Sequence, residues 1–245
     1  MNGKAIIKFL VVIAAIIGLF AYFIQPLAGS LKQGLDLQGG THIVLEAEDS
    51  ATGTADNDAV ERAKQILERR INEMGLSEPL VQREGARRII IELPGVKDPD
   101  EAIKRIGKTA VLEFKNDQGQ TVMTGDDLKD AKEELGQNKQ PLVAIELSDE
   151  GAKKFADLTS KNIGRRIAIT LDGKELTNPV VQQAITGGKA TISGSQSLEE
   201  AKDLAILLRS GALPVKINVL EVHTVGPSLG QDSKDKSIVA FSAGI

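Results

Sequence analysis

The sequence predicts an α+β protein in which an N-terminal transmembrane helix precedes two α+β lobes. Three observations support this prediction: an apolar run near the N-terminus, a strand–helix–strand–strand–helix–strand pattern behind it, and a further set of alternating and helical patterns in the second half. With 245 residues, of which 41% are hydrophobic and 26% charged, the chain has the length and composition of one large domain or two small ones.

The apolar run FLVVIAAIIGLFAYFI occupies residues 9–24 and follows Lys4 and Lys8. Extended over residues 5–27, this run is long enough to cross a bilayer as a helix. The alternative is a cleavable signal peptide, for which residues 28–30 would form a poor cleavage site. We favour an uncleaved anchor, whose lysines keep the N-terminus cytoplasmic and place the rest of the chain outside the membrane.

Six elements are predicted in the segment that follows. Asp58 is predicted to cap the first helix, and Asp98 with Pro99 signals the start of the second. The order is the split βαβ pattern of ferredoxin-like folds, in which two helices cover one face of a four-stranded antiparallel sheet. The predicted elements are a strand at 41–48, a helix at 59–74, strands near 79–83 and 86–95, a helix at 99–106 and a strand at 111–115.

A second α+β unit follows a polar turn at residues 116–119. Thr124 is predicted to cap a helix in GDDLKDAKEELG, and Ser148 to cap another helix after the strand LVAIELS. RRIAITLDGKEL predicts a strand that runs into a turn at residues 172–173, whereas GGKATISG is predicted to be a loop. Ser197 caps the last helix. The predicted buried face of that helix consists of Leu198, Ala201, Leu204, Ala205 and Leu208.

The final predicted strand, at residues 215–225, changes its apolar phase. Val219 continues one face of the strand, whereas Leu220 occupies the other. Such a change indicates a β-bulge or a strand that serves two packing environments. We interpret it as the strand that leaves the second unit and re-enters the first sheet. The second unit is then an insertion, connected by two strands near Leu112 and Leu213.

These patterns divide the chain into five segments, with an inserted α+β head domain between the two parts of a ferredoxin-like base. The last segment contains SIVAFSAGI, which either begins a second, truncated transmembrane helix or packs on the domain as a short apolar tail. The predicted segments are 1–32 (transmembrane helix and linker), 33–116 (first part of the base), 117–213 (head), 214–230 (final base strand and junction) and 231–245 (start of a second transmembrane helix).

The composition excludes several classes of protein. A formal net charge of −4 argues against a nucleic-acid binder, which needs a basic surface to neutralise phosphates. Aromatic residues make up only 3%, so base-stacking platforms are not expected. The chain has no Cys and therefore no disulfide, thiolate zinc site or Cys nucleophile. No catalytic motif stands out, and we expect neither an enzyme nor a cofactor.

His42 and His223 are the only histidines, and each lies in a predicted strand. A metal site would require that they be adjacent and that a third ligand join them. We expect two partly solvated strand residues and no metal. The arginine pairs at 69–70 and 87–88 are expected to lie on solvated faces.

Several motifs together resemble the SecD family of membrane subunits of the bacterial protein-export machinery. Each motif is weak alone, but their order and spacing over residues 34–230 are specific. In order, the motifs are GLDLQGG directly after the predicted membrane helix, ERRINEMGLSEPLVQREGARRIIIELPGV, NIGRRIAITLDG with NPV, GGKATISG, EEAKDLAILLRSGALPV and TVGPSLG.

The resemblance implies a function that the spacing alone does not give. Members of the family work with SecF as a proton-driven accessory to the SecYEG channel, in the inner (cytoplasmic) membrane of bacteria. They assist late translocation by binding the unfolded preprotein outside the membrane. The family's exported domain has a base near the membrane and a mobile head, and its proton-carrying residues lie in membrane helices that this chain lacks.

The resemblance also implies three groups of site residues. From the residues alone, the two glycine-marked motifs also fit a linker and a turn, and the segment 177–185 fits a Pro-broken connector. The membrane-proximal motif would comprise Gly34, Asp36, Gly39, Gly40, Gly226, Pro227 and Gly230. The hinge between head and base would comprise Leu112, Phe114, Gly211, Leu213 and Pro214. The preprotein-binding residues of the head would be Asn178, Pro179, Val180 and Val181.

A second class of function remains open: a membrane-anchored extracytoplasmic adaptor or scaffold that binds partner proteins but never contacts the substrate. A third class, an extracytoplasmic enzyme, is the least favoured, because no catalytic constellation is visible. Cross-linking of an arrested export intermediate to the head would separate the first two classes.

Overall fold

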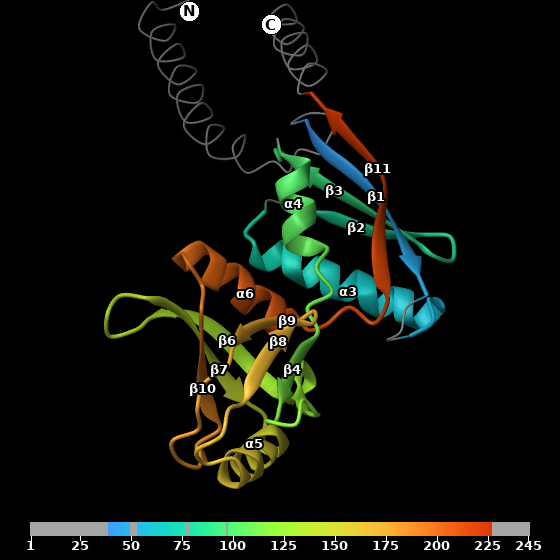
Figure 1. The fold of residues 1–245 in the computed structure, drawn as a ribbon. Helices are drawn as coiled ribbons and strands as arrows, with labels where there is room; N and C mark the ends of the chain where they lie inside the picture. The colour runs from blue at the N-terminus through green and yellow to red at the C-terminus, as the bar shows by residue number, and fades with distance from the viewer. Residues whose placement is uncertain (1–38, 50–52, 77–78, 97, 227–245) are drawn as a thin grey trace, which may run out of the picture. The chain divides into compact units, whose positions relative to one another are not determined.

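The computed structural model describes residues 39–226 except 50–52, 77–78 and 97 (Figure 1). The predicted transmembrane segments at 1–32 and 231–245 lie outside the described residues. None of the helices in the described part has the length and apolar character needed to span a membrane. The described part is a mixed α+β fold, as the sequence predicts, with three antiparallel sheets and four α-helices.

The first lobe, here called the base, is a four-stranded antiparallel sheet in the order β11-β1-β3-β2. Helices α3 and α4 contribute their buried faces to the same core as this sheet, which includes Ile43, Leu67 and Ile91. The base consists of β1 (Gly40–Glu48), α3 (Asn57–Glu73), β2 (Leu80–Glu84), β3 (Arg88–Pro94), α4 (Pro99–Ile106) and β11 (Lys216–Val225).

The fourth strand of the base sheet comes from the C-terminal end of the described chain. The prediction that the strand at 111–115 completes this sheet is wrong, because β4 (Leu112–Lys115) pairs with β8 and β5 in a different sheet. The predicted return of the last strand is confirmed, since β11 pairs with β1 along its length. The predicted bulge is also confirmed: Val44 pairs with Glu221 and Leu45 with Val219, so Leu220 is the extra residue.

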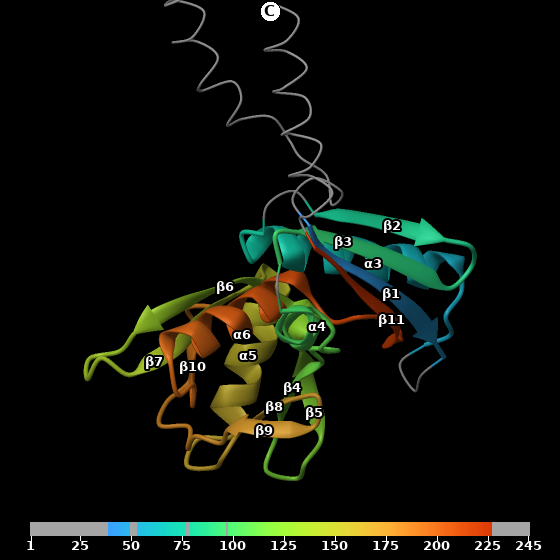
Figure 2. The same cartoon turned by 90° about the horizontal axis from the view of Figure 1, so that it is seen from above.

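The second lobe, here called the head, contains two sheets, in the orders β10-β7-β6 and β5-β4-β8-β9. Helix α6 contacts β6 and β7 on one side and α3 of the base on the other (Figures 1 and 2). The head core includes Phe114 and Phe155, whose rings meet edge-on with centroids 5.9 Å apart. The head consists of β4, β5 (Thr121–Thr124), η1 (Gly125–Asp127), β6 (Leu128–Leu135), β7 (Pro141–Leu147), α5 (Asp149–Lys161), β8 (Ala168–Leu171), β9 (Lys174–Thr177), β10 (Lys189–Ser193) and α6 (Leu198–Ser210).

Two predictions of secondary structure in the head are wrong. The segment predicted as a helix after Thr124 is a short 3-10 turn followed by β6. Its charged sequence favours a helix locally, but pairing with β7 and burial of Ala131 against the head core override that propensity. The segment predicted as a loop contains β10, which pairs with β7 through five residue pairs.

Most predicted helix caps are confirmed. The side chains of Asp98, Ser148 and Ser197 accept hydrogen bonds from the first turns of α4, α5 and α6. The cap of α3 is Asp56 rather than Asp58, and its carboxylate accepts from the amide of Ala59 at 2.8 Å. The predicted buried face of α6 is correct except for Leu198, which is 47% exposed.

Candidate functional site

The two lobes are connected by two chain segments, here called the first crossing (residues 107–111) and the second crossing (residues 211–212). The crossings lie side by side, since the amide of Leu213 donates to the carbonyl of Thr109 at 2.8 Å. Ala110 in the first crossing has φ 61° and Gly211 in the second has φ 90°. Positive φ is costly for alanine, so the first crossing is held in its conformation by its surroundings.

The predicted hinge residues fall on both sides of these crossings. Leu112 and Phe114 are fixed in the head core, with 1% and 0% exposure, whereas Leu213 is part of the base core. Gly211 forms the end of α6, and Pro214 follows Leu213 into the base. The part of the connection that belongs to neither core is therefore shorter than the predicted hinge.

Arg70 is a buried residue at this connection that the sequence prediction placed wrongly. It was expected on a solvated face, but its relative exposure is 0%. Its guanidinium donates to the backbone oxygens of Ile106 at 2.7 Å and of Lys108, and to Ser210 Oγ at 3.2 Å and the oxygen of Gly211 at 2.8 Å. Burial lowers the pKa of Arg70 to about 10, so the group remains charged at neutral pH.

Asp172 fastens the first crossing to the head. Its carboxylate accepts from the amides of Ala110 at 3.1 Å and Val111 at 2.9 Å, and its own amide donates to the carbonyl of Val111 at 2.9 Å. Asp172 lies in the tight turn between β8 and β9 with φ 51°, a conformation that Asp tolerates better than most residues. The predicted turn at 172–173 is thus confirmed. The sequence did not predict that the Asp172 side chain in this turn accepts hydrogen bonds from the first crossing.

Two ion pairs join the lobes beside Arg70. Arg209 of α6 contacts Glu73 of α3 at 2.8 Å, and Arg105 of α4 contacts Asp203 of α6. All four side chains are between 23% and 30% exposed. The hydrogen bonds that Arg209 donates to Glu73 raise the pKa of Arg209.

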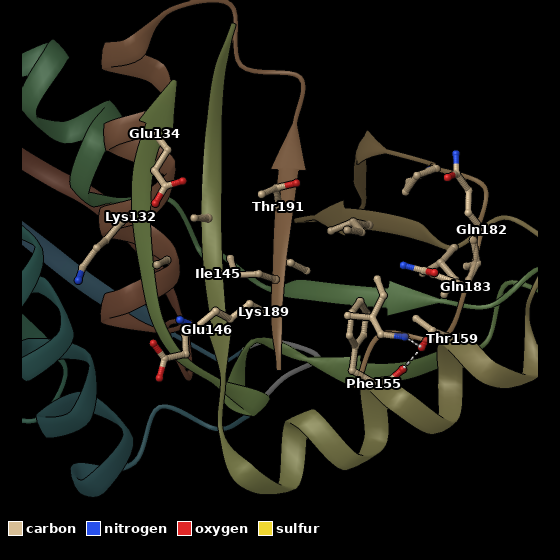
Figure 3. A pocket seen from close by; sticks show the side chains of 18 of the residues that line it. Lys132, Glu134, Ile145, Glu146, Phe155, Thr159, Gln182, Gln183, Lys189 and Thr191 are labelled. Atoms are coloured by element: carbon tan, nitrogen blue, oxygen red, sulfur yellow. Dashed lines mark hydrogen bonds between the residues drawn. The ribbon is translucent and has the colours of Figure 1, made fainter. Parts of the chain in front are cut away.

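The head contains a groove with a volume of about 750 Å³ (Figure 3). On one side it is lined by the face of the β6-β7-β10 sheet that carries Lys132, Glu134 and Glu146. The opposite wall is formed by α5, β8 and the segment 179–185. Its apolar lining comprises Phe155, Ile167, Ile169, Pro179, Val180, Val181 and Ile185.

Two acidic side chains on the sheet side of the groove, Asp130 and Glu146, form ion pairs. Lys132 contacts Asp130 at 3.2 Å, and Lys129 contacts Glu146 at 2.6 Å. The hydrogen bond from Lys132 lowers the pKa of Asp130, and the one from Lys129 lowers the pKa of Glu146. The groove therefore has one largely apolar wall and one wall that carries charged side chains, which suits a ligand that presents apolar groups on one side and polar groups on the other.

The residues predicted to bind preprotein lie at this groove. Pro179, Val180 and Val181 line it, and Val180 is 46% exposed. Asn178 precedes them outside the lining, and its Oδ1 is buried without a hydrogen-bond partner within the described residues. Thr159 Oγ1 donates to the carbonyl of Phe155 and accepts from the amide of Ile185, which fixes the segment against α5 (Figure 3). The sequence located this segment but not the wall of sheet that faces it.

The described members of the membrane-proximal motif come together at one end of the base sheet. Gly40 pairs with Val225, the neighbour of Gly226. Gly39 and Gly40 have φ 68° and 147°, and the carbonyl of Gly39 accepts from the amide of Gly95 at 3.0 Å. These backbone angles favour glycine. The remaining members Gly34, Asp36, Pro227 and Gly230 lie outside the described residues.

The two histidines are cross-strand neighbours on β1 and β11, with ring centroids 6.5 Å apart. His42 Nδ1 lies 3.4 Å from Glu92, and His223 Nε2 lies 2.7 Å from Glu221. Within the described part of the chain, no group of three or more metal-ligating side chains is arranged around one point.

Replacing both histidines by alanine is expected to leave folding and function nearly unchanged. His42 is half-buried and His223 is exposed, so the loss of each contact with Glu92 or Glu221 costs at most about 1 kcal/mol. The thermal midpoint and the metal content by mass spectrometry check this. A tightly bound metal at unit stoichiometry would contradict the expectation.

Comparison with known proteins places the chain in a family. Three family models match it: "SecD/SecF GG Motif" at residues 31–51, "Protein translocase subunit SecDF, P1 domain, N-terminal" at 60–119, and "SecDF, P1 head subdomain" at 103–215. The "Protein translocase subunit SecD" of Acidaminococcus fermentans is 57% identical over all 245 residues, which correspond to 59% of that protein.

Solved structures agree with this match. A crystal structure of SecDF in a super-membrane-facing form is 42% identical, with a TM-score of 0.73 over 85% of this chain and 33% of that chain. A second, from work on "a membrane component SecDF that enhances protein export", is 39% identical, with a TM-score of 0.68 over 74% of this chain and 99% of that chain.

The fold with two lobes, the glycine motif and these similarities define a protein translocase subunit. The chain belongs to the SecD/SecDF family, as its sequence motifs indicate. It spans 59% of the length of the Acidaminococcus relative.

Proposed function

We propose that this chain carries the exported domain of a SecD-type subunit of the bacterial Sec translocase, which promotes late, proton-driven steps of export by transiently holding the emerging preprotein. In this proposal it acts with SecF and the SecYEG channel, with its N-terminus in the cytoplasm and its main domain outside the inner membrane. The observation that carries the proposal is the groove of about 750 Å³ in the head, which combines a largely apolar wall with a wall of charged side chains.

An unfolded polypeptide fits such a groove in an extended conformation. Successive side chains of an extended segment point to opposite sides, so alternate residues would meet the apolar wall and the charged sheet. Within the described residues, β10 pairs with β7 on one side only, which leaves a strand edge for backbone hydrogen bonds. Recognition through backbone and alternating contacts tolerates many sequences, as an export factor requires.

The strand order supports a finer description of the base. We propose that it is ferredoxin-like, with β11 as the fourth strand and the head inserted between α4 and β11. The order β11-β1-β3-β2, with all neighbours antiparallel, fits this topology. The convergence of Gly40 and Val225 fits a membrane-proximal end that receives movement from transmembrane helices. Head rotation would then occur in the two crossings.

Binding of a fluorescent, unfolded preprotein segment to the purified full-length subunit tests the proposal. We expect micromolar or weaker affinity, about −8 kcal/mol or less in magnitude, because a transient grip must release. Val180→Asp is expected to weaken binding about tenfold, because it places a charge on the apolar wall without disturbing a fully buried residue.

Val122→Asp provides a matched control for this substitution. Val122 is 41% exposed on β5, outside the groove lining, so its replacement has a similar cost in folding and is expected to leave binding unchanged. Equal binding by the two variants and the unchanged protein would show that this groove is not the binding site. No binding by the unchanged protein would favour the alternative function, an adaptor or scaffold that never contacts substrate.

A further inference from the structure

One buried side chain contacts both segments that connect the lobes. Arg70 projects from α3 of the base and donates to Ile106 and Lys108 at the end of α4, where the chain leaves the base. The same guanidinium donates to Ser210 and Gly211 at the end of α6, where the chain returns from the head. Its four acceptors within the described residues are one hydroxyl and three backbone carbonyls, and none is a carboxylate.

The chemistry of this contact requires arginine. A planar guanidinium has five N–H donors in a fixed fork and can therefore satisfy several carbonyls from different segments, whereas an ammonium has three donors on one atom. The ends of α4 and α6 carry the partial negative charge of the helix dipole, which favours a cation between them. Any rotation that separates these helix ends would leave buried donors or carbonyls unpaired.

The other contacts between the lobes discriminate less between orientations. The pairs Arg209–Glu73 and Arg105–Asp203 are roughly a quarter exposed, so water and salt can replace them as the lobes separate. Arg70 is completely excluded from solvent and has no such replacement. Among the described residues, it is the buried contact that joins α3 to both crossings.

We infer that Arg70 is the positioning residue that sets the orientation of the head on the base, and that the head can turn only after Arg70 releases the carbonyls of at least one crossing. The inference deepens the proposed function, because it names the contact that head movement has to break. The orientation of the head does not depend on preprotein binding. An experiment can therefore refute the positioning role of Arg70 without refuting the proposed function, and the reverse.

The test measures a distance between the lobes in the full-length protein. Gln65 on α3 and Lys153 on α5 are exposed, and these 245 residues contain no Cys. With any Cys elsewhere in the full-length subunit replaced by Ser, cysteines at these two positions are the only sites for spin labels. We expect one narrow distance distribution in the otherwise unchanged protein. In Arg70→Met, the population in that distribution is expected to fall about tenfold relative to other orientations, since the anchoring donors are lost. Arg70→Lys is expected to lie between the two.

Controls separate positioning from stability. Arg69→Met removes an exposed guanidinium from the adjacent position of the same helix and should leave the distances unchanged. A purely structural role for Arg70 would lower the thermal midpoint without altering the distance distribution of the folded protein, and that result would overturn the inference. If Arg70→Met does not fold, the same distance is measured in Arg70→Lys and in Ser210→Ala. A broadened distance distribution supports the inference, and an unchanged distribution in both variants refutes it.

Preprotein binding in the same samples separates this inference from the proposed function. Arg70 does not line the groove, so its variants should bind the fluorescent segment as the unchanged protein does. Failure of the unchanged protein to bind that segment would count against the proposed function, whereas the distance shift in Arg70→Met would still support the positioning role.

Discussion

Cross-linking α3 to α6 is expected to abolish assistance to export, and reduction of the cross-link is expected to restore it. The positions are Glu73 and Arg209, whose side chains are in contact at 2.8 Å, each replaced by cysteine and joined by a short, reducible thiol reagent. A covalent bridge at this point fixes the head in the orientation of this structure. If export assistance depends on rotation of the head about the two crossings, the locked full-length subunit should be inactive.

The controls for this experiment use a full-length subunit in which any Cys outside these 245 residues, which contain none, is replaced by Ser. The unchanged protein treated with the same reagent, and each single cysteine variant, should retain activity. The reduced double variant lacks the ion pair but should also be active, because a pair of this exposure contributes only about 0.2–1 kcal/mol. Full activity of the locked form in a vesicle translocation assay would refute the movement of the head.

The sequence predicted the segments of the base well because each carries a local signal. The cap Asp98 acts through the first turn of its own helix, and the phase change at Leu220 indicates the bulge in β11. The sequence was less successful in predicting which sheet each strand joins. The pattern of Leu112–Lys115 predicts a strand but not its sheet, and only its pairing with β8 places it in the head.

The candidate site was predicted where it is contiguous and missed where it is assembled from distant segments. Val180 and Val181 were found because proline marks their segment, but the sheet face opposite them is contributed by strands whose charges resemble a helix pattern. Arg70 follows Arg69 on a helix, and the arginine pair alone does not distinguish its exposed member from its buried one. The helical period does, because Arg70 follows the buried Leu67 by three residues and lies beside the apolar stripe, whereas Arg69 lies on the opposite face. The acceptors of Arg70 are one side-chain hydroxyl and three backbone carbonyls at positions up to 141 residues away, and these partners cannot be predicted from side-chain patterns.

A protein made of these 245 residues alone is expected to hold preprotein but not to drive its export. The groove and both crossings are present, so binding of the fluorescent segment should match that of the full-length subunit. Directional movement needs an energy source, and the sequence contains no phosphate-binding glycine loop. The predicted membrane segment contains no Asp, Glu, Lys, Arg or His between Phe9 and Leu27, so it offers no proton relay.

Reconstitution with the SecYEG channel in vesicles, with and without a proton gradient, tests whether these residues hold preprotein without driving its export. One proton that crosses 100 mV releases about 2.3 kcal/mol. That energy exceeds the contribution of either partly exposed ion pair between the lobes, each about 0.2–1 kcal/mol. A few protons would also offset the loss of the buried Arg70 hydrogen bonds to one crossing, each about 1–3 kcal/mol, if membrane helices coupled to the base. We therefore expect the gradient to stimulate export severalfold with the full-length subunit and SecF, and to have no effect with the 245-residue protein. Gradient-stimulated export with the 245-residue protein alone would show that holding and driving reside in the same segment.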